Sequence, residues 1–287
     1  MIRCRTAALV LTLLTSGAAY AAGEPAGPPL SAAPLRPTAP RLPPVPPRPA
    51  DADAATYERC MKLASEEPKA ARDLAAGWQQ KGGAHPAEHC LAVALIGLKQ
   101  YKDAAERLEK LAPAMVHAPA ALRAEVWGQA AQAWLLAGDP GRAYAAAGAA
   151  LALRPDDADL LLDRAEAAGA AGWFDQAIAD LDRVLNADPA RSDALIYRAS
   201  AYRAQDRIGP ALADVEAALK LAPASPPALL ERGNIRSLRG DLDGAREDWR
   251  RVTALAPGSA AATAAGANIA RLDSQNAAPP AIPAGKR

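Results

Sequence analysis

The fold is decided by three consecutive stretches that align without a gap. Residues 158–189 read ADLLLDRAEAAGAAGWFDQAIADLDRVLNADP, residues 192–223 read SDALIYRASAYRAQDRIGPALADVEAALKLAP, and residues 226–257 read PPALLERGNIRSLRGDLDGAREDWRRVTALAP. Each stretch ends in a proline, and the prolines recur every 34 residues, at Pro155, Pro189, Pro223 and Pro257. An alanine stands twelve residues before each proline, and an alanine or glycine stands twenty-four before it. Because several residue types keep one period, the chain contains a structural repeat.

Each repeat is predicted to form two helices joined by a turn. The two small positions let the helices approach closely, and the proline ends the second helix. Between the helices a glycine provides the conformational freedom that a sharp turn needs, at Gly138, Gly172 and Gly240. The following helix is expected to start after a side chain that can cap its first turn: Asp157, Ser225 or Ser259.

This period, with its small positions and its terminal proline, resembles the tetratricopeptide repeat (TPR), a helix–turn–helix unit. The resemblance extends over residues 53–273. It implies an all-α fold, a right-handed α-solenoid of about six stacked TPR repeats closed by a C-terminal capping helix. The expected solenoid domain spans 51–273, with repeats near 53–82, 85–113, 124–155, 158–189, 192–223 and 226–257 and a cap at 259–273.

The composition agrees with an all-helical chain. Of the 287 residues, 51% are hydrophobic, mainly alanine and then leucine, and 4% are aromatic. Alanine and leucine favour helices, whereas the β-branched and aromatic residues that favour strands are scarce. The formal net charge is +1, so the sequence lacks the strongly basic footprint of a nucleic-acid-binding protein.

The two ends of the chain differ from the repeats. Residues 1–22 have the pattern of a signal peptide: a positive start, a short apolar run and small residues, with cleavage expected after Ala21 or Ala22. This predicts a periplasmic or secreted protein without a membrane span. An uncleaved anchor and a lipoprotein are the alternatives, although Cys4 precedes the apolar run. Residues 23–50 are expected to form a proline-rich spacer, and residues 274–287 a disordered tail.

Two charged positions also keep the 34-residue period. Arginines recur in the first helix at Arg164, Arg198 and Arg232, and aspartates in the second at Asp180, Asp214 and Asp248. In the preceding repeat both positions hold alanine, Ala130 and Ala146. The joint presence and joint loss favours ion pairs within or between repeats. The alternative is a row of basic side chains that binds an acidic ligand.

No motif in the sequence points to catalysis. His85, His89 and Cys90 superficially resemble metal ligands, but Cys90 lies about 100° around a helix from His89, so the three cannot easily converge. The sequence has no nucleophile elbow, no zinc-protease motif and no phosphate-binding loop. We therefore expect no enzyme activity, no cofactor and no metal.

The TPR resemblance also implies a binding surface. In TPR proteins the first helices of the repeats line a concave side, where an extended peptide or a partner helix is usually held. Carried over to this chain, the ligand-facing positions include Gln132, Leu162, Glu166, Ile196, Ser200, Arg203, Leu230 and Asn234. Some chaperone-binding members clamp a C-terminal carboxylate with basic residues and asparagine. Only Asn234 fits that pattern, so this mode is disfavoured.

These observations predict a periplasmic scaffold or adaptor that binds a protein or peptide partner in the groove. Two alternatives are a self-associating module that forms a homo-oligomer, and an accessory subunit tethered to the envelope through the proline-rich arm.

Cys60 and Cys90 are predicted to form a disulfide. They are the only cysteines left after cleavage of the signal peptide, and an exported protein meets conditions in which disulfides persist. Both lie in the first helices of consecutive repeats, which pack as neighbours in the solenoid. The alternative is a pair of buried free thiols.

Overall fold

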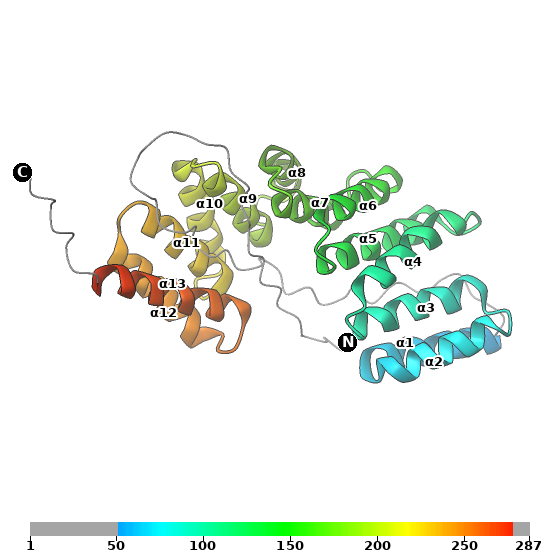
Figure 1. Ribbon diagram of the computed structural model, residues 1–287. Helices are drawn as coiled ribbons and strands as arrows, with labels where there is room; N and C mark the ends of the chain where they lie inside the picture. Colours follow the sequence, from blue (N-terminus) through cyan, green and yellow to red (C-terminus); the bar gives the residue numbers. More distant parts are fainter. Residues whose placement is uncertain (1–50, 278–287) are drawn as a thin grey trace, which may run out of the picture.

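The computed structural model describes residues 51–277. The predicted signal peptide, the proline-rich spacer and residues 278–287 lie outside this range. The described residues form thirteen α-helices and no strand. In chain order (Figure 1) these are α1 (Asp51–Glu66), α2 (Pro68–Gln79), α3 (Ala84–Gly97), α4 (Tyr101–Ala114), α5 (Ala120–Leu136), α6 (Pro140–Leu153), α7 (Ala158–Ala170), α8 (Phe174–Ala187), α9 (Ser192–Ala204), α10 (Ile208–Leu221), α11 (Pro226–Leu238), α12 (Leu242–Leu255) and α13 (Ala260–Ala277).

Every helix packs against the next one along the chain, so α1 to α12 form six consecutive helix pairs and α13 closes the stack. The predicted all-α solenoid of six repeats and a capping helix is confirmed. Several boundaries differ from the sequence prediction, including the start of α5 at Ala120, four residues before the predicted repeat. Helix α13 continues to Ala277, four residues into the predicted tail, and α4 continues one residue beyond Pro113, to Ala114.

The helix starts follow the predicted capping residues. Asp157 accepts hydrogen bonds from the backbone N–H groups of Asp159 and Leu160, which α7 itself leaves without partners. Ser225 caps α11 in the same way, with Pro226 at the first helical position, and Ser259 caps α13. Each cap fixes the residue at which the chain leaves the loop and enters the helix.

The turns inside the pairs use the predicted glycines. Gly138, Gly172 and Gly240 have φ between 78° and 80°, the left-handed region that glycine adopts without steric cost. In two other pairs a residue with a side chain takes this conformation: Lys99 between α3 and α4, at φ 60°, and Asp206 between α9 and α10, at φ 59°. A residue with a Cβ is strained in this region, so these two turns are less favourable than the glycine turns.

The small positions determine how closely two paired helices approach. Ala131 and Ala199 are completely buried, and Ala165 is 3% exposed. In the last pair the small residue is Gly233, and a Cβ built there would lie 2.6 Å from Nε1 of Trp249. That pair therefore combines a smaller residue on α11 with a larger residue on α12. In the two preceding pairs the residues equivalent to Trp249 are the smaller Leu181 and Val215.

The helix pairs follow one another along an arch (Figure 1). From α5 onward each odd-numbered helix contacts the next odd-numbered helix, whereas within residues 51–277 the even-numbered helices make no comparable contact with one another. Because elements on the inside of a curve lie closer together, the odd-numbered helices line the concave side. We call the concave surface of α5, α7, α9 and α11 the inner face.

The hydrophobic core is divided along the arch. One large cluster of buried residues extends from Ala124 to Leu272, and a second extends from Cys60 to Ala167. Two small clusters, around Ala64 and Tyr57, lie in the first pairs. This division is expected for a solenoid, in which each repeat packs only against its neighbours.

Candidate functional site

The apolar positions predicted to face a ligand are buried. Leu162 is completely inaccessible, Leu230 is 2% exposed and Ile196 is 5% exposed, and all three belong to the larger core cluster. These side chains contribute to the packing of the solenoid. The inner face therefore offers a partner mainly its polar side chains.

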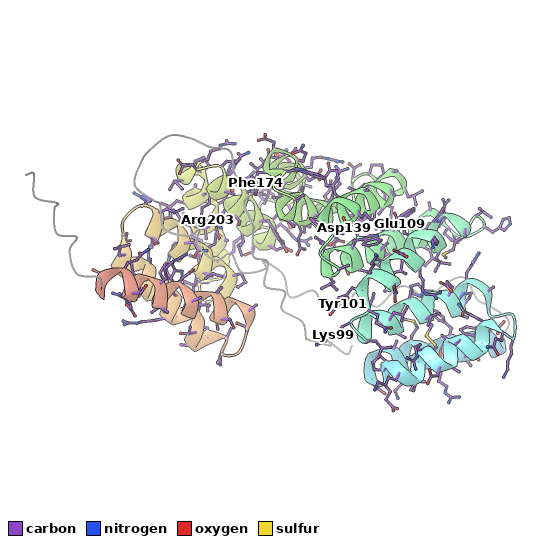
Figure 2. The ribbon with its side chains drawn as sticks, in the orientation of Figure 1. Lys99, Tyr101, Glu109, Asp139, Phe174 and Arg203 are labelled. Carbon is purple, nitrogen blue, oxygen red and sulfur yellow. A yellow bond between two sulfur atoms is a disulfide. The ribbon has the colours of Figure 1, made fainter. Side chains whose placement is uncertain are left out.

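The polar predicted residues connect neighbouring odd-numbered helices. Gln132 on α5 donates to a carboxylate oxygen of Asp163 on α7, at 3.5 Å. Arg203 on α9, which is marked in Figure 2, donates to both carboxylate oxygens of Glu231 on α11, at 2.6 and 3.3 Å, and to the hydroxyl of Ser200. Glu166 on α7 is partly exposed. The polar residues predicted to face a ligand thus also connect neighbouring repeats.

Asn234, the one residue that fits the clamp pattern, is completely buried. Its side-chain oxygen accepts hydrogen bonds from Nε1 of Trp249 at 3.2 Å and from Nδ2 of Asn268 at 2.9 Å. It therefore joins α11 to both α12 and α13. Its contacts link the last helix pair to the capping helix.

A row of acids on the inner face was not selected from the sequence. Glu125, Asp159 and Asp193 occupy the same repeat position, 34 residues apart, on α5, α7 and α9. Their side chains are 24%, 44% and 32% exposed. Their shared period was the signal that could have found them. Together with the three acids already named on these helices, Asp163, Glu166 and Glu231, we call them the acidic row.

Arginines from the loops between pairs cross-link this row. Arg154 donates to Glu125 at 2.9 Å, and Arg191 bridges Asp159 at 2.7 Å and Asp193 at 2.8 Å. The hydrogen bonds that Arg191 donates to Asp193 and Asp159 raise its pKa above the ordinary value. With Arg203, three arginines pair with members of the six-residue acidic row.

The periodic arginines form structural ion pairs, as predicted. Each donates through Nε and Nη2 to both oxygens of the aspartate sixteen residues later, within its own helix pair. The pairs are Arg164–Asp180, Arg198–Asp214 and Arg232–Asp248, with distances of 2.6 to 2.9 Å. The aspartate side chains are only 1 to 11% exposed. This two-point geometry is the strongest form of the arginine–carboxylate interaction, and the hydrogen bonds raise the pKa of each arginine.

The two neighbouring histidines have separate environments. His85 is exposed, whereas His89 on α3 is buried and lies between Tyr57 of α1 and Gln129 of α5. Its Nδ1 is 2.9 Å from the Tyr57 hydroxyl, and its Nε2 is 2.8 Å from Oε1 of Gln129. Because the amide oxygen can only accept, Nε2 carries the proton and Nδ1 accepts from Tyr57. Burial lowers the pKa of His89 and raises that of Tyr57.

No group of three metal-ligating side chains occurs within the described residues. No helix between residues 51 and 277 has the length and apolar character needed to cross a membrane.

Cys60 on α1 and Cys90 on α3 lie side by side. Both are completely buried, their Sγ atoms are 1.99 Å apart and their Cα atoms 6.1 Å apart. A disulfide needs Cα atoms within about 7 Å, so the two positions can be bridged without moving the backbone. The geometry is that of a disulfide between the first two odd-numbered helices.

Comparison with known proteins identifies the fold. No family model matches the sequence, and no curated protein matches it. Among solved structures, MamA (41-end) from Desulfovibrio magneticus RS-1 superposes with a TM-score of 0.51 at 19% identity, over 60% of this chain and 94% of its own. A thermophilic TPR protein from Thermus thermophilus reaches 0.53 at 19% identity, over 65% and 100%.

A third structure, the Cut9–Hcn1 hetero-tetramer of APC/C, superposes with a TM-score of 0.55 at 13% identity, covering 76% of this chain and 42% of that one. The chain therefore has the TPR fold, and the resemblance drawn from the repeat period is confirmed at the level of the fold.

Proposed function

We propose that this protein is an exported scaffold that binds a protein or peptide partner on the inner face. The observation that carries the proposal is the acidic row, in which Glu125, Asp159 and Asp193 stay partly exposed in the same position of three successive repeats. A surface that repeats in step with the solenoid suits an extended partner, which can meet each repeat in turn.

The chemistry of the inner face defines the kind of partner. The apolar side chains at the predicted ligand-facing positions, Leu162, Ile196 and Leu230, are buried, so recognition there rests on hydrogen bonds and charge. An extended segment with several basic residues would complement the partly exposed carboxylates of Glu125, Asp159 and Asp193, and complementary charge increases both the association rate and the specificity. The signal-peptide pattern and the adjacent Cys60 and Cys90 support the proposed periplasmic location.

The test compares two triple variants of the full chain, expressed with its leader and chemically crosslinked to its partners inside the cell. The inner variant carries Gln132→Ala, Glu166→Ala and Ser200→Ala. The control carries Gln176→Ala, Asn186→Ala and Glu216→Ala, three exposed positions on the even-numbered helices α8 and α10. We expect the inner variant to lose at least about tenfold of the captured partner and the control to keep it.

Equal capture by both variants would refute binding on the inner face. Light scattering of the purified chain addresses self-association separately. A mass that grows with concentration and falls back in the inner variant would identify a second copy as the partner.

A further inference from the structure

Two leucines at the turn of the last helix pair are exposed to solvent. Leu238 ends α11 and is 53% exposed, and Leu242 begins α12 and is 37% exposed. The position of Leu238 holds alanine in the two preceding pairs. The equivalents of Leu242 in those pairs, Phe174 and Ile208, are half-buried against the larger core cluster. The last pair therefore presents additional apolar surface at its turn, and we call Leu238 and Leu242 the end patch.

In earlier pairs the start of the second helix contacts the turn of the next hairpin. Trp173 of the α7–α8 turn stacks edge-on against Tyr144 of α6, with ring centroids 5.3 Å apart. Gln205 of the α9–α10 turn donates to Asp175 of α8 at 2.7 Å. In the part of the chain that the structure describes, no hairpin follows α12, because α13 stays helical through the equivalent positions, 273–275. The start of α12 therefore lacks the turn that contacts its counterparts.

The end of α13 lies beside the end patch. The connection between α12 and α13 is short, so the two helices run antiparallel, and Arg246 of α12 donates to Asp273 of α13 at 2.6 Å. Leu242 lies one helical turn before Arg246, and Ala277, the last residue of α13, lies one turn after Asp273. Residues 278–287 therefore leave the solenoid next to Leu242.

This departing segment has the composition of a cover for apolar surface. Residues 278–284 contain only alanine, proline and isoleucine, and the charged Lys286 and Arg287 follow. Its prolines prevent the helix from continuing and reduce the conformational freedom that is lost when the segment becomes ordered. At about 3.1 Å per residue, the five residues from Ala277 to Ile282 span up to roughly 15 Å, which is enough to turn back over the adjacent patch.

We propose that residues 278–287 fold back across the α11–α12 turn of their own chain and place Ile282 on the end patch. The segment takes the place that the turn of the next hairpin has in earlier pairs, and it completes the cap of the solenoid. The contact is apolar, because acids beside the patch already pair with arginines: Asp241 with Arg236 and Asp273 with Arg246. It is separate from partner binding on the inner face, because it lies at the ends of the helices.

The first test places a photoreactive amino acid at Ala281 of the full chain and maps the crosslinks by mass spectrometry. A chain with the same group at Ala33 is the control. We expect crosslinks to the peptide that contains the end patch at least about tenfold above the control, because burial of one isoleucine side chain stabilises the contact by this factor or more. The yield should persist in about 1 M salt, which screens exposed charges but not apolar contacts.

Mixing isotopically light and heavy chains shows which chain supplies the segment. Crosslinks at the level of the control, or crosslinks that mainly join a light chain to a heavy chain, would overturn docking of a chain's own segment.

A second measurement follows the accessibility of the end patch by hydroxyl-radical labelling. The internal control is Leu255, which is 48% exposed at the other end of α12. In the full chain the patch should be labelled several-fold more slowly than Leu255. Ile282→Ser should raise labelling of the patch several-fold and leave Leu255 unchanged, whereas Ile282→Val should keep the protection. Equal labelling of the patch and Leu255 in the full chain would contradict the proposal.

Deletion of residues 278–287 separates this contact from the proposed function. The deletion should expose the end patch to labelling as strongly as Ile282→Ser does, with capture of the partner on the inner face unchanged. Thermal unfolding verifies that each variant folds. If the patch stays protected after the deletion, another element covers it and the proposed contact is refuted. If the patch becomes exposed but no captured partner depends on the inner face, the contact stands without the scaffold function.

Discussion

The first two helix pairs and the three pairs from α7 to α12 build the same hairpins with different chemistry. In α7 to α12 each hairpin is closed by its own two-point arginine–aspartate pair, and the arginines are 19 to 22% exposed. In α1 to α4 two contacts run between hairpins: the sulfurs of Cys60 and Cys90 join α1 to α3, and His89 joins α3 to α1 and α5. The ion pair within α3 and α4, Arg107–Glu88, has an arginine that is 42% exposed.

This difference shows that a strict sequence period and contacts between hairpins can fulfil the same structural role. Where the 34-residue period is strict, each hairpin carries its own arginine–aspartate pair and stacks on a neighbour with the same repeat positions. Where the period is interrupted, five extra residues separate Ala104 from Ala143 compared with the later repeats, and no direct packing of α3 on α5 comparable to that of the later odd-numbered helices is present in residues 51–277. At that junction the buried His89 of α3 contacts Gln129 of α5, while the sulfurs of Cys60 and Cys90 join α1 to α3 one pair earlier.

The largest effect is expected from the cysteine pair. Replacing both Cys60 and Cys90 by serine should destabilise the first two helix pairs by about 3 kcal/mol, since the bridge closes a loop of about 30 residues in the unfolded chain. Hydrogen exchange should show faster opening of α1 to α4, with α7 to α12 unaffected. Alkylation of the unfolded exported protein without a reductant provides the check: two labelled thiols would disprove the bridge.

The next effect tests the local polar contacts of the regular region. Arg164→Ala leaves the Asp180 carboxylate, whose side chain is 5% exposed, without its partner, and should cost about 2 kcal/mol. Adding Asp180→Ala should restore much of this loss, because the adjacent hairpin folds with Ala130 and Ala146 in the same positions. Urea unfolding measures both variants, and a double variant as unstable as the single one would contradict this explanation.

A smaller effect is expected on the pH dependence of stability, which should differ between α1 to α4 and α7 to α12. The folded-state pKa of His89 is lowered by burial, so the unfolded chain binds the proton more readily, and stability should fall as the pH decreases below about 6.5. Unfolding of α1 to α4, followed by hydrogen exchange at pH 7 and pH 5, should show this loss. His89→Gln removes the titrating group and should flatten the dependence, while the exposed His85→Gln should leave it unchanged.

The smallest expected effect is an increase in stability. Asp206→Gly should stabilise the α9–α10 hairpin by about 0.5–1 kcal/mol, because it relieves the left-handed conformation that glycine occupies in the neighbouring turns. Glycine at the exposed position Glu216, in the interior of α10, should instead destabilise the same hairpin by about 1 kcal/mol. A gain from both substitutions, or from neither, would refute strain at Asp206.

The hairpins, caps and charge pairs could be predicted from the sequence because each repeats at a fixed interval. The prediction of Arg164 with Asp180 required only the observation that both are missing where Ala130 and Ala146 stand. The burial of individual side chains was harder to predict. The period places Leu162 and Glu166 on the same helix face but does not say that the first is covered by packing while the second reaches the surface.

The contacts of His89 could not be predicted by the same reasoning. Tyr57, His89 and Gln129 come from three helices and belong to no repeated pattern, so only the three-dimensional stacking of α1, α3 and α5 brings them together. The acidic row, by contrast, does repeat, but the ligand-facing positions carried over from the TPR family fall mostly on other residues of the same helices.

The closed arginine–aspartate pairs have a consequence for how such a gene can change. A recombination event that removes or adds 34 codons within the regular region transfers each arginine together with the aspartate that it binds. The ion pair across that join from Arg198 to Asp182 also keeps an acidic partner, because the equivalent residue in the next repeat, Glu216, is acidic too. Copies of this hairpin can therefore be gained or lost with the three arginine–aspartate pairs intact. The exception is the buried Glu231, whose partner Arg203 lies in the preceding hairpin, because the residue equivalent to Arg203 one repeat earlier is Gly169.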